Sequence, residues 1–389
     1  MARRTARTIS LDYGGDQPLA LSPRAGCLIA DCHGPDGTRG QAADALVTEA
    51  LERSDHGPPL ASHVVAGDRV AVAVAGAVPQ REQVMAAVRR CLEMAGVQPD
   101  DVVVVHEPPE KDSDTAYLAA DEEGSPLYLS RSLIDADVVV GIGCWNWDAS
   151  LGGRSIEGEL WPTFSRVESR RGLSRELARR GRHALAGWRT EMQEIAWQLG
   201  VCASLRLVPG RDGTLAAAAF GLPDSAAHAA RDEARAWSPQ VKRSAMLTIA
   251  SVSRPSEPWD DAGMLAATRA IAAAARVTDE SGTICLVSRL AVEPGIIFSR
   301  WRQGAPLRGL VHEALDQDDP RLTADALQTR LFARALGDRR LVLLSDLPAT
   351  TVEDLEFGCA ESPAVVERLA TKSESLIVLH EADLMLPRM

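Results

Sequence analysis

The sequence predicts an α/β protein of two domains, each with a mostly parallel sheet flanked by helices. Apolar runs of strand length are followed by segments with helical periodicity in the first part of the chain. The same succession starts again after residue 238. We therefore expect one domain over residues 1–238 and a second over residues 239–389.

The first domain begins with short extended segments at YGG and PLALSP, and a polar region then runs to His63. From Asp68, RVAVAVAG predicts a strand, and residues 81–95 carry apolar side chains at helical spacing before a capping glycine. DVVVVHE predicts the next strand, so strand, helix and strand form a βαβ unit with parallel strands. SPLYLSRSLIDADVVVGIG supplies a further buried strand.

The later elements follow the same logic. Apolar residues recur at three- and four-residue steps over residues 185–199, which predicts a helix with one apolar stripe. ASLRLVPGRDGTLAAAAFG predicts a hairpin, and an alanine-rich helix follows over residues 224–237. In the second domain, AMLTIASV, TICLVS, LVLLSD and SLIVLH predict strands, while GMLAATRAIAAAARV and ESPAVVERLA predict helices.

Composition excludes some classes of function. The net charge of −12 and the pI near 5.2 argue against nucleic-acid binding, which needs a basic face to neutralise phosphates. The N-terminus lacks the apolar core of a secretory signal, and no apolar run reaches the length of a membrane span. We expect a soluble, cytoplasmic protein without a membrane partner. The seven cysteines show no zinc-site or disulfide spacing, so we expect most to be small buried residues.

The segment CWNWDASLGGRS, residues 144–155, follows a predicted buried strand, at the position where α/β proteins usually bind ligands. It contains no histidine, lysine or glutamate. The preceding GIG has two glycines of a dinucleotide fingerprint, but asparagine stands in place of the third, which favours a tight turn. The chain also has neither a phosphate-binding GxxxxGK[ST] loop nor a GxSxG nucleophile motif.

Histidines give two candidates. His106 ends the strand DVVVV beside Glu107 and Glu110, so it is either a general base or a partly exposed loop residue. His33 lies in HGPDG, which is typical of a turn. None of the eight histidines pairs with another at the spacing of a metal site on one element. A metal site would have to be assembled from distant parts of the chain.

The stretch SRVESRRGLSRELARRGRH, residues 165–183, is rich in arginine although the chain as a whole is acidic. Arginine forks bind phosphate and carboxylate groups, so this segment could contact a phosphate or an acidic partner. A solvated helix face is the other interpretation.

The order of several motifs resembles the nickel-dependent lactate racemase family over nearly the whole chain. The similar motifs are YGG, GDRVAVAV, MAGVQPDDVVVV, GSPLYLSRSLIDADVVVGIG, LGGR, SVSRPSEPWDD with the helix and strand after it, and LVLLSDLPATTVEDL. The resemblance implies a two-domain fold with a nickel-pincer nucleotide, attached through a lysine, between the domains. It also implies racemisation of a 2-hydroxy acid, in which histidines exchange the hydroxyl proton and nickel and the nucleotide ring take the hydride.

The sequence departs from the family where that chemistry is carried. Ser155 stands at the position of the attachment lysine, and Trp145 replaces a catalytic histidine. The metal-binding histidine would fall near Arg170 and Arg171, and AGAVPQ replaces the segment that binds the substrate with aspartate and arginine. PPE stands where another catalytic histidine belongs, and Leu265 and Thr268 replace a glutamine and a lysine. Serine cannot supply an amine, and indole donates but does not accept protons, so we expect no nickel-pincer cofactor and no metal in the family form.

Two hypotheses follow. The first is a divergent racemase or epimerase of a hydroxy acid that uses a displaced set: His106, Glu107, Asp148, Arg170 and Arg171. The second is a non-catalytic relative that binds a small carboxylate or hydroxy acid, or a protein partner, in the cleft between the domains, where Trp145 and Trp147 would supply contact area. A nicotinamide oxidoreductase is a distant third. The expected ligand contacts are Trp145, Asp148, Gly152, Gly153, Arg154, Ser155, Arg170, Arg171 and Asp260. The substrate and the oligomeric state stay open.

Overall fold

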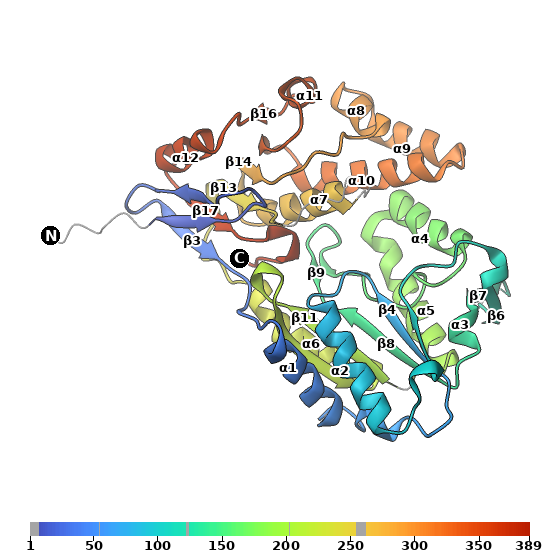
Figure 1. Ribbon diagram of the computed structural model, residues 1–389. Coiled ribbons are helices and arrows are strands. Elements are labelled where there is room, and N and C mark those ends of the chain that lie inside the picture. Colours follow the sequence, from blue (N-terminus) through green and yellow to red (C-terminus); the bar gives the residue numbers. More distant parts are fainter. Residues whose placement is uncertain (1–7, 54, 122–123, 202, 254–261) are drawn as a thin grey trace.

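The computed structural model describes residues 8–53, 55–121, 124–201, 203–253 and 262–389. Within these ranges the chain forms two α/β units, each built on one large sheet (Figure 1). The helices are α1 (Gln41–Glu52), α2 (Arg81–Met94), α3 (Arg131–Ile134), α4 (Val167–Arg180), α5 (Leu185–Gln198), α6 (Pro223–Glu233), α7 (Ala262–Ala275), α8 (Ile296–Arg302), α9 (Leu307–Asp316), α10 (Pro320–Leu336), α11 (Ala349–Asp354) and α12 (Pro363–Lys372). The strands are β1 (Ile9–Leu11), β2 (Leu19–Leu21), β3 (Leu28–Cys32), β4 (Val70–Ala75), β5 (Val102–Val105), β6 (Thr115–Ala120), β7 (Pro126–Ser130), β8 (Val138–Cys144), β9 (Trp147–Asp148), β10 (Gly153–Arg154), β11 (Ala203–Pro209), β12 (Leu215–Gly221), β13 (Ala245–Ser251), β14 (Thr278–Val287), β15 (Arg340–Leu344), β16 (Gly358–Cys359) and β17 (Leu376–Leu379).

The first unit contains a five-stranded sheet in the order β12-β11-β8-β4-β5. Its strands run parallel except β12, which returns antiparallel to β11 as the predicted hairpin. β4 is buried along its whole length, because side chains from α1 and α2 cover one face of the sheet and side chains from α3, α4 and α5 cover the other. Burial on both faces explains why this strand is a continuous apolar run.

The second unit contains a six-stranded parallel sheet in the order β16-β15-β14-β13-β17-β3. Residues of α7 and α10 pack on one face of it. The β1–β2 hairpin and α12 pack on the other face. The prediction of an α/β fold with mostly parallel sheets flanked by helices is therefore confirmed.

Two elements lie in the region before His63 where the sequence predicted only polar chain, namely β3 and α1. β3 pairs with β17 and so belongs to the second sheet, although the expected division placed residues 1–238 in the first domain. The reason is that β3 forms its ladder with a strand almost 350 residues later, and no local pattern encodes such a pairing. Its side chains are mostly half-buried, which leaves only a weak apolar signal.

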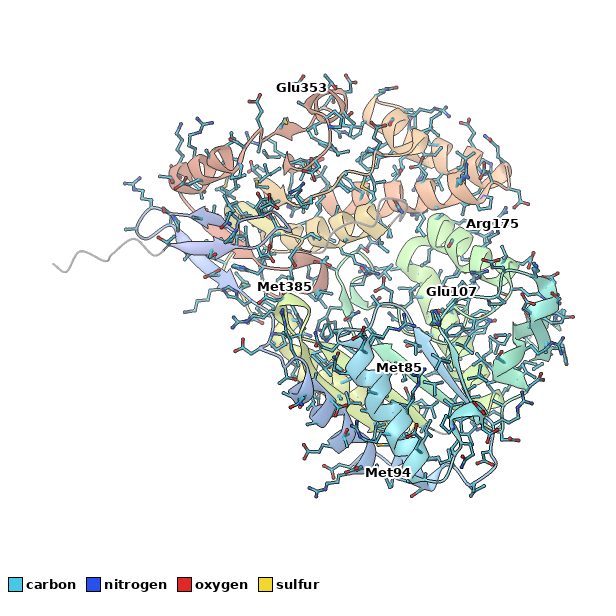
Figure 2. All side chains as sticks on the ribbon, viewed as in Figure 1. Met85, Met94, Glu107, Arg175, Glu353 and Met385 are labelled. Atoms are coloured by element: carbon cyan, nitrogen blue, oxygen red, sulfur yellow. The ribbon has the colours of Figure 1, made fainter. Side chains whose placement is uncertain are left out.

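The two units meet through a shared hydrophobic core. This core includes Trp145, Trp147 and Trp237 from the first unit together with Ile271 and Met385 from the second. Figure 2 shows Met385 where the two units face each other. On the opposite side of the junction α4 lies against α10 and α9 (Figure 1). Among the described helices, none combines the length and the apolar character that a membrane span requires.

Candidate functional site

The loop that leaves the carboxyl end of β8 lies at the junction of the two units. Its first part folds back as the small antiparallel pair β9 and β10, in which Gly153 pairs with Asp148. Gly152 has φ of 75°, a conformation that glycine adopts at little cost, and this allows the tight return. Gly152, Gly153 and Arg154 thus form the turn and second strand of a hairpin.

The glycines of GIG have a different role from the one predicted. Gly143 lies inside β8 rather than in a tight turn. A Cβ atom on Gly143 would lie 2.5 Å from the carbonyl oxygen of Gly158, so the missing side chain lets the returning loop approach the strand. The interpretation of GIGCWN as a tight turn was wrong, because the sequence does not reveal which backbone packs against the strand.

The tryptophans of this loop are core residues. Trp145 is 3 % exposed, and its ring meets that of Trp147 edge to face with 4.6 Å between centroids. Trp147 is also buried and donates its indole N–H to the carbonyl oxygen of Ala234 at 2.9 Å. Packing of this kind stabilises the junction between the units. It leaves neither ring as exposed contact area for a ligand or a partner.

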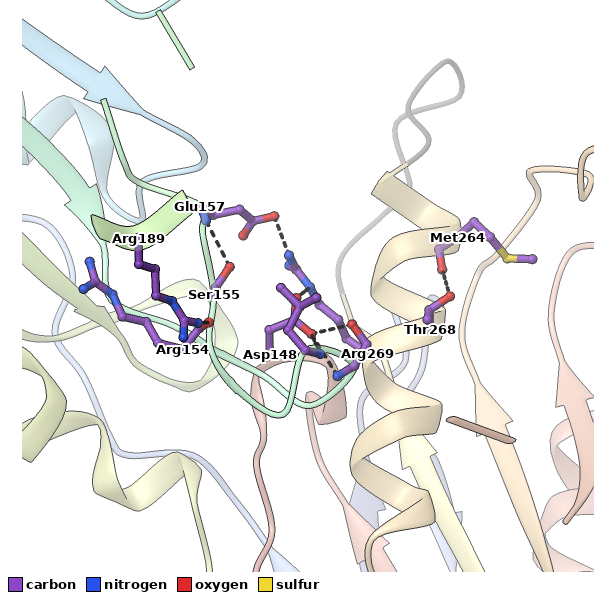
Figure 3. A network of polar contacts seen from close by, with 10 residues as sticks. Asp148, Arg154, Ser155, Glu157, Arg189, Met264, Thr268 and Arg269 are labelled. Atoms are coloured by element: carbon purple, nitrogen blue, oxygen red, sulfur yellow. Dashed lines mark hydrogen bonds and ion pairs between the residues drawn. The ribbon is translucent and has the colours of Figure 1, made fainter. Parts of the chain in front are cut away.

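Asp148 holds the loop and joins it to the second unit. It is 1 % exposed, and its Oδ1 accepts hydrogen bonds from the backbone N–H groups of Ser150 and Leu151. Its Oδ2 accepts from Nε of Arg269, which reaches across from α7, at 2.8 Å. Arg269 also contacts Glu157 at 2.9 Å, so one guanidinium binds two carboxylates of the loop (Figure 3).

The electrostatics of Arg269 favour its charged form. Burial alone would lower the pKa of its guanidinium, but Asp148 and Glu157 outweigh this effect and raise the pKa above the ordinary value. A permanently charged group between two carboxylates is a structural clamp. It is not suited to donate and accept protons in a reaction.

Ser155 lies inside the same loop. Its side chain is buried, its Oγ accepts a hydrogen bond from the backbone N–H of Glu157 at 3.1 Å, and its own N–H donates to the carbonyl oxygen of Asn146. On α7, the hydroxyl of Thr268 donates to the carbonyl oxygen of Met264 one turn earlier (Figure 3). Both hydroxyls thus satisfy nearby backbone groups.

A second charged cluster supports the loop from the first unit. The carboxylate of Glu159 lies between Arg154 and Arg206, with a separation of 3.0 Å from Nη2 of Arg206. Arg189 donates to the carbonyl oxygen of Arg154 at 2.8 Å. Burial raises the pKa of the Glu159 carboxyl, but the two arginines outweigh it and hold the pKa below its ordinary value. Of this cluster, only Arg154 was among the residues predicted from the sequence.

Replacing Glu159 with glutamine is expected to lower the free energy of unfolding at pH 7 by about 2 kcal/mol, because hydrogen bonds to a charged group are lost. Since the pKa of Glu159 is lower in the folded protein, the unfolded chain binds a proton at this side chain more readily than the folded protein does as the pH falls. The contribution of Glu159 is therefore complete above about pH 4.3, the usual pKa of glutamate, and is lost as the pH falls further. Urea unfolding of both proteins across this range measures the difference.

The matched control is Glu233→Gln on the exposed face of α6. Its stability should follow that of the wild type at every pH. If the Glu159→Gln curve also ran parallel to the wild type down to pH 3, the carboxylate would not be stabilised by its arginines.

The displaced catalytic set does not come together as one site. His106 is 46 % exposed, and its Nε2 lies 3.6 Å from Oε1 of Glu107. Arg170 does reach this region, since its Nη2 donates to the carbonyl oxygen of Pro109 at 3.2 Å. Asp148 instead binds Arg269 from its place on the loop after β8, and Arg171 is exposed on α4. Asp260 lies outside the described residues.

No family model and no curated protein sequence matches this chain. Solved structures do match it, and together with the two-unit architecture they define a protein of the lactate racemase fold. The lactate racemase apoprotein from Thermoanaerobacterium thermosaccharolyticum is similar with a TM-score of 0.72 and 15% identity, covering 98% of this chain and 100% of the other. A protein from Thermotoga maritima, solved by a structural genomics consortium, is similar with a TM-score of 0.61 and 11% identity, covering 91% and 99%.

Proposed function

We propose that this chain uses the lactate racemase fold to bind a small polycarboxylate acid between its two units, without nickel-pincer chemistry. The proposal chooses the non-catalytic hypothesis over a divergent racemase or epimerase. Its main support is a basic cavity at the junction of the units.

The residues at the pincer positions do not fit that cofactor. Attachment needs a nucleophilic amine, and Ser155 offers a buried hydroxyl that already accepts a hydrogen bond from Glu157. Proton transfer needs an imidazole, and Trp145 offers a buried indole. The guanidinium of Arg269 lies between Asp148 and Glu157 beside this position. These observations support a structural role for the residues at the pincer positions.

The basic cavity has a volume of about 250 Å³ and lies against the turn of the β9–β10 hairpin. Arg182 comes from the first unit, while Arg276, Arg334 and Arg339 come from the second. Alanines and Gly152 form the rest of its wall with Ser150, and the lining contains no carboxylate among the described residues. Four cations around one small space favour an anionic ligand.

The arginines of this cavity are held in place or oppose one another. Nε of Arg276 donates to the carbonyl oxygen of Pro387 at 2.7 Å, and Arg339 donates to that of Thr278. Burial lowers the pKa of Arg334, and the nearby Arg182 lowers it further. A bound carboxylate would relieve this repulsion, because it supplies the missing negative charge.

A larger groove of about 970 Å³ lies between α4 and the helices α9 and α10, and Arg334 lines both this groove and the cavity. Some of the groove cations have carboxylate partners, since Glu176 pairs with Arg179 and Asp318 pairs with Arg175. The inner cavity differs from the groove in that its lining contains no carboxylate among the described residues. We assign the ligand's charged groups to the inner cavity and its entry to the groove.

Calorimetric titration with citrate, pyrophosphate and both enantiomers of lactate tests the proposal. Citrate should bind more tightly than lactate, because it places several carboxylates among the arginines. Arg334→Gln should weaken citrate binding about tenfold or more, since a hydrogen bond between charged groups contributes about 1.5–3 kcal/mol. Arg231→Gln on exposed α6 changes the net charge equally and should leave binding unchanged.

Each of the following results would overturn the proposal. The first is equal citrate affinity in wild type and Arg334→Gln, and the second is the absence of citrate binding in both proteins. The third is tighter binding of pyrophosphate than of citrate, which would replace the carboxylate with a phosphate ligand. The last is racemisation of lactate by protein that carries stoichiometric nickel after it is produced together with the enzymes that make the pincer nucleotide.

A further inference from the structure

We propose that Asp31, His33 and His380 form a binding site for a divalent transition metal ion such as Zn²⁺. Among the described residues, these three bring their ligand atoms within 4.8 Å of one another. The site is separate from the basic cavity and from the loop after β8, so it does not depend on the proposed function.

The sheet brings the three residues together. β3 and β17 are parallel neighbours in which Val378 pairs with Asp31, and the N–H of His380 donates to the carbonyl oxygen of Cys32 at 3.0 Å. Asp31 and His33 are two residues apart, so they leave the end of the strand on the same side. His380 directly follows β17 at the same carboxyl edge. This edge is where parallel sheets usually place their ligand sites.

The distances suit a metal ion. Oδ1 of Asp31 lies 3.0 Å from Nε2 of His380 and 3.3 Å from Nε2 of His33. Zinc ligands at about 2.0–2.2 Å in a tetrahedron lie about 3.4 Å from one another. The two imidazole rings stack with 3.8 Å between centroids, and the same nitrogen of each is directed at one carboxylate oxygen. An ion at this point would take the place of the contact between Nε2 of His380 and Oδ1 of Asp31.

Burial and charge also fit. The side chain of Asp31 is 7% exposed and that of His380 is 12% exposed, while His33 is 38% exposed at the rim. The carboxylate of Asp31 already faces one nitrogen of each histidine, so the three groups converge on one point. Two imidazoles and one carboxylate are a ligand set that first-row transition metals accept.

Three protein ligands leave one coordination position open. A cavity of about 250 Å³ lies beside two of these ligands and is lined by His33 and His380 together with Asp12, Arg211, Ser251 and Glu381. Glu381 is fixed beside it, since its carboxylate accepts from the N–H of Asp212 and the hydroxyl of Ser253. A site with three protein ligands and one free position is typical of metal ions that bind water or a small molecule.

The test uses full-length protein without a histidine tag, freed of metal by chelation and titrated with zinc against a chromophoric chelator. Wild type should bind one zinc ion per chain, and His33→Ala and Asp31→Asn should each weaken binding at least about tenfold. His228→Ala, which removes an exposed histidine on α6, is the matched control and should bind like the wild type. Cobalt should give the visible spectrum of a four-coordinate ion in wild type and not in His33→Ala.

Folding does not confound the measurement, because His33 is half exposed and its variant can be checked by circular dichroism. Zinc should also raise the unfolding temperature of the wild type and not that of His33→Ala, since only the folded site binds the ion. Failure of the wild type to retain zinc, or equal affinity in wild type and both variants, would overturn the proposal and leave the three residues as a hydrogen-bonded link between β3 and β17.

Discussion

Replacing Arg269 with methionine is expected to lower the free energy of unfolding by about 3–5 kcal/mol, the usual loss when one partner of a buried ion pair is removed. Asp148 is 1% exposed and would lose its only cation among the contacts described here. Its Oδ1 accepts hydrogen bonds from two backbone N–H groups, but these neutral groups cannot neutralise its charge. Because Arg269 lies on α7 and Asp148 on the loop after β8, the loss should also loosen the junction of the units. Urea unfolding followed by circular dichroism measures it.

Two further variants test whether the loss of stability comes from an uncompensated buried charge. Arg235→Gln removes an exposed arginine that pairs with Asp232, and it should change stability little. Combining Arg269→Met with Asp148→Asn should recover part of the loss, because no uncompensated charge is then buried. If Arg269→Met cost less than about 1 kcal/mol, as an exposed pair would, the clamp between the units would have no energetic importance.

The sequence predicted the parts of the fold that rest on local patterns. The strands β4 and β8 are apolar runs buried along their whole length, and β5 is an apolar run at the edge of the sheet. The helices α2, α5 and α7 lie where the sequence predicted helices. These patterns can be seen in the sequence because the spacing of apolar residues within one element reveals which of its faces is buried. α1 carries such a pattern, since it buries Ala43, Val47 and Leu51 at four-residue steps, but no helix was predicted there. β3 was missed for the opposite reason. β3 is half-buried at the edge of its sheet and pairs with a distant strand.

The sites were harder to predict than the fold. The sequence pointed to the loop after β8 and to Ser155. The resemblance to the lactate racemase family also drew attention to Thr268, but nothing indicated Arg269 one residue later. The metal candidate shows the same limit, since His33 and His380 lie almost 350 residues apart and come together only through the pairing of β3 with β17. The arginines at 276, 334 and 339 likewise converge through helix packing. In each case the partner is chosen by tertiary structure.

Replacing Trp237 with alanine is expected to cost about 3–5 kcal/mol, the range measured when a large aromatic side chain is removed from a core. Trp237 is 1% exposed and belongs to the core shared by both units. Its ring covers Gly34 so closely that a Cβ there would lie 2.1 Å from it, and its indole N–H donates to the carbonyl oxygen of Pro209 at 2.7 Å. The backbone carbonyl of Trp237 also accepts from the N–H of Leu386. Thermal and urea unfolding measure the loss.

The size of this effect should come from burial and from the position of Trp237 between the units. Trp237→Phe keeps most of the apolar surface but leaves the carbonyl of Pro209 without its donor, so it should cost less, about 1–3 kcal/mol. Trp197→Ala removes a tryptophan that is 82% exposed on α5 and should change stability by no more than about 0.5 kcal/mol. Equal losses for Trp197→Ala and Trp237→Ala would contradict a shared core. The graded order of alanine, phenylalanine and the exposed control is expected because Trp237 fills the apolar core in which residues of both units pack.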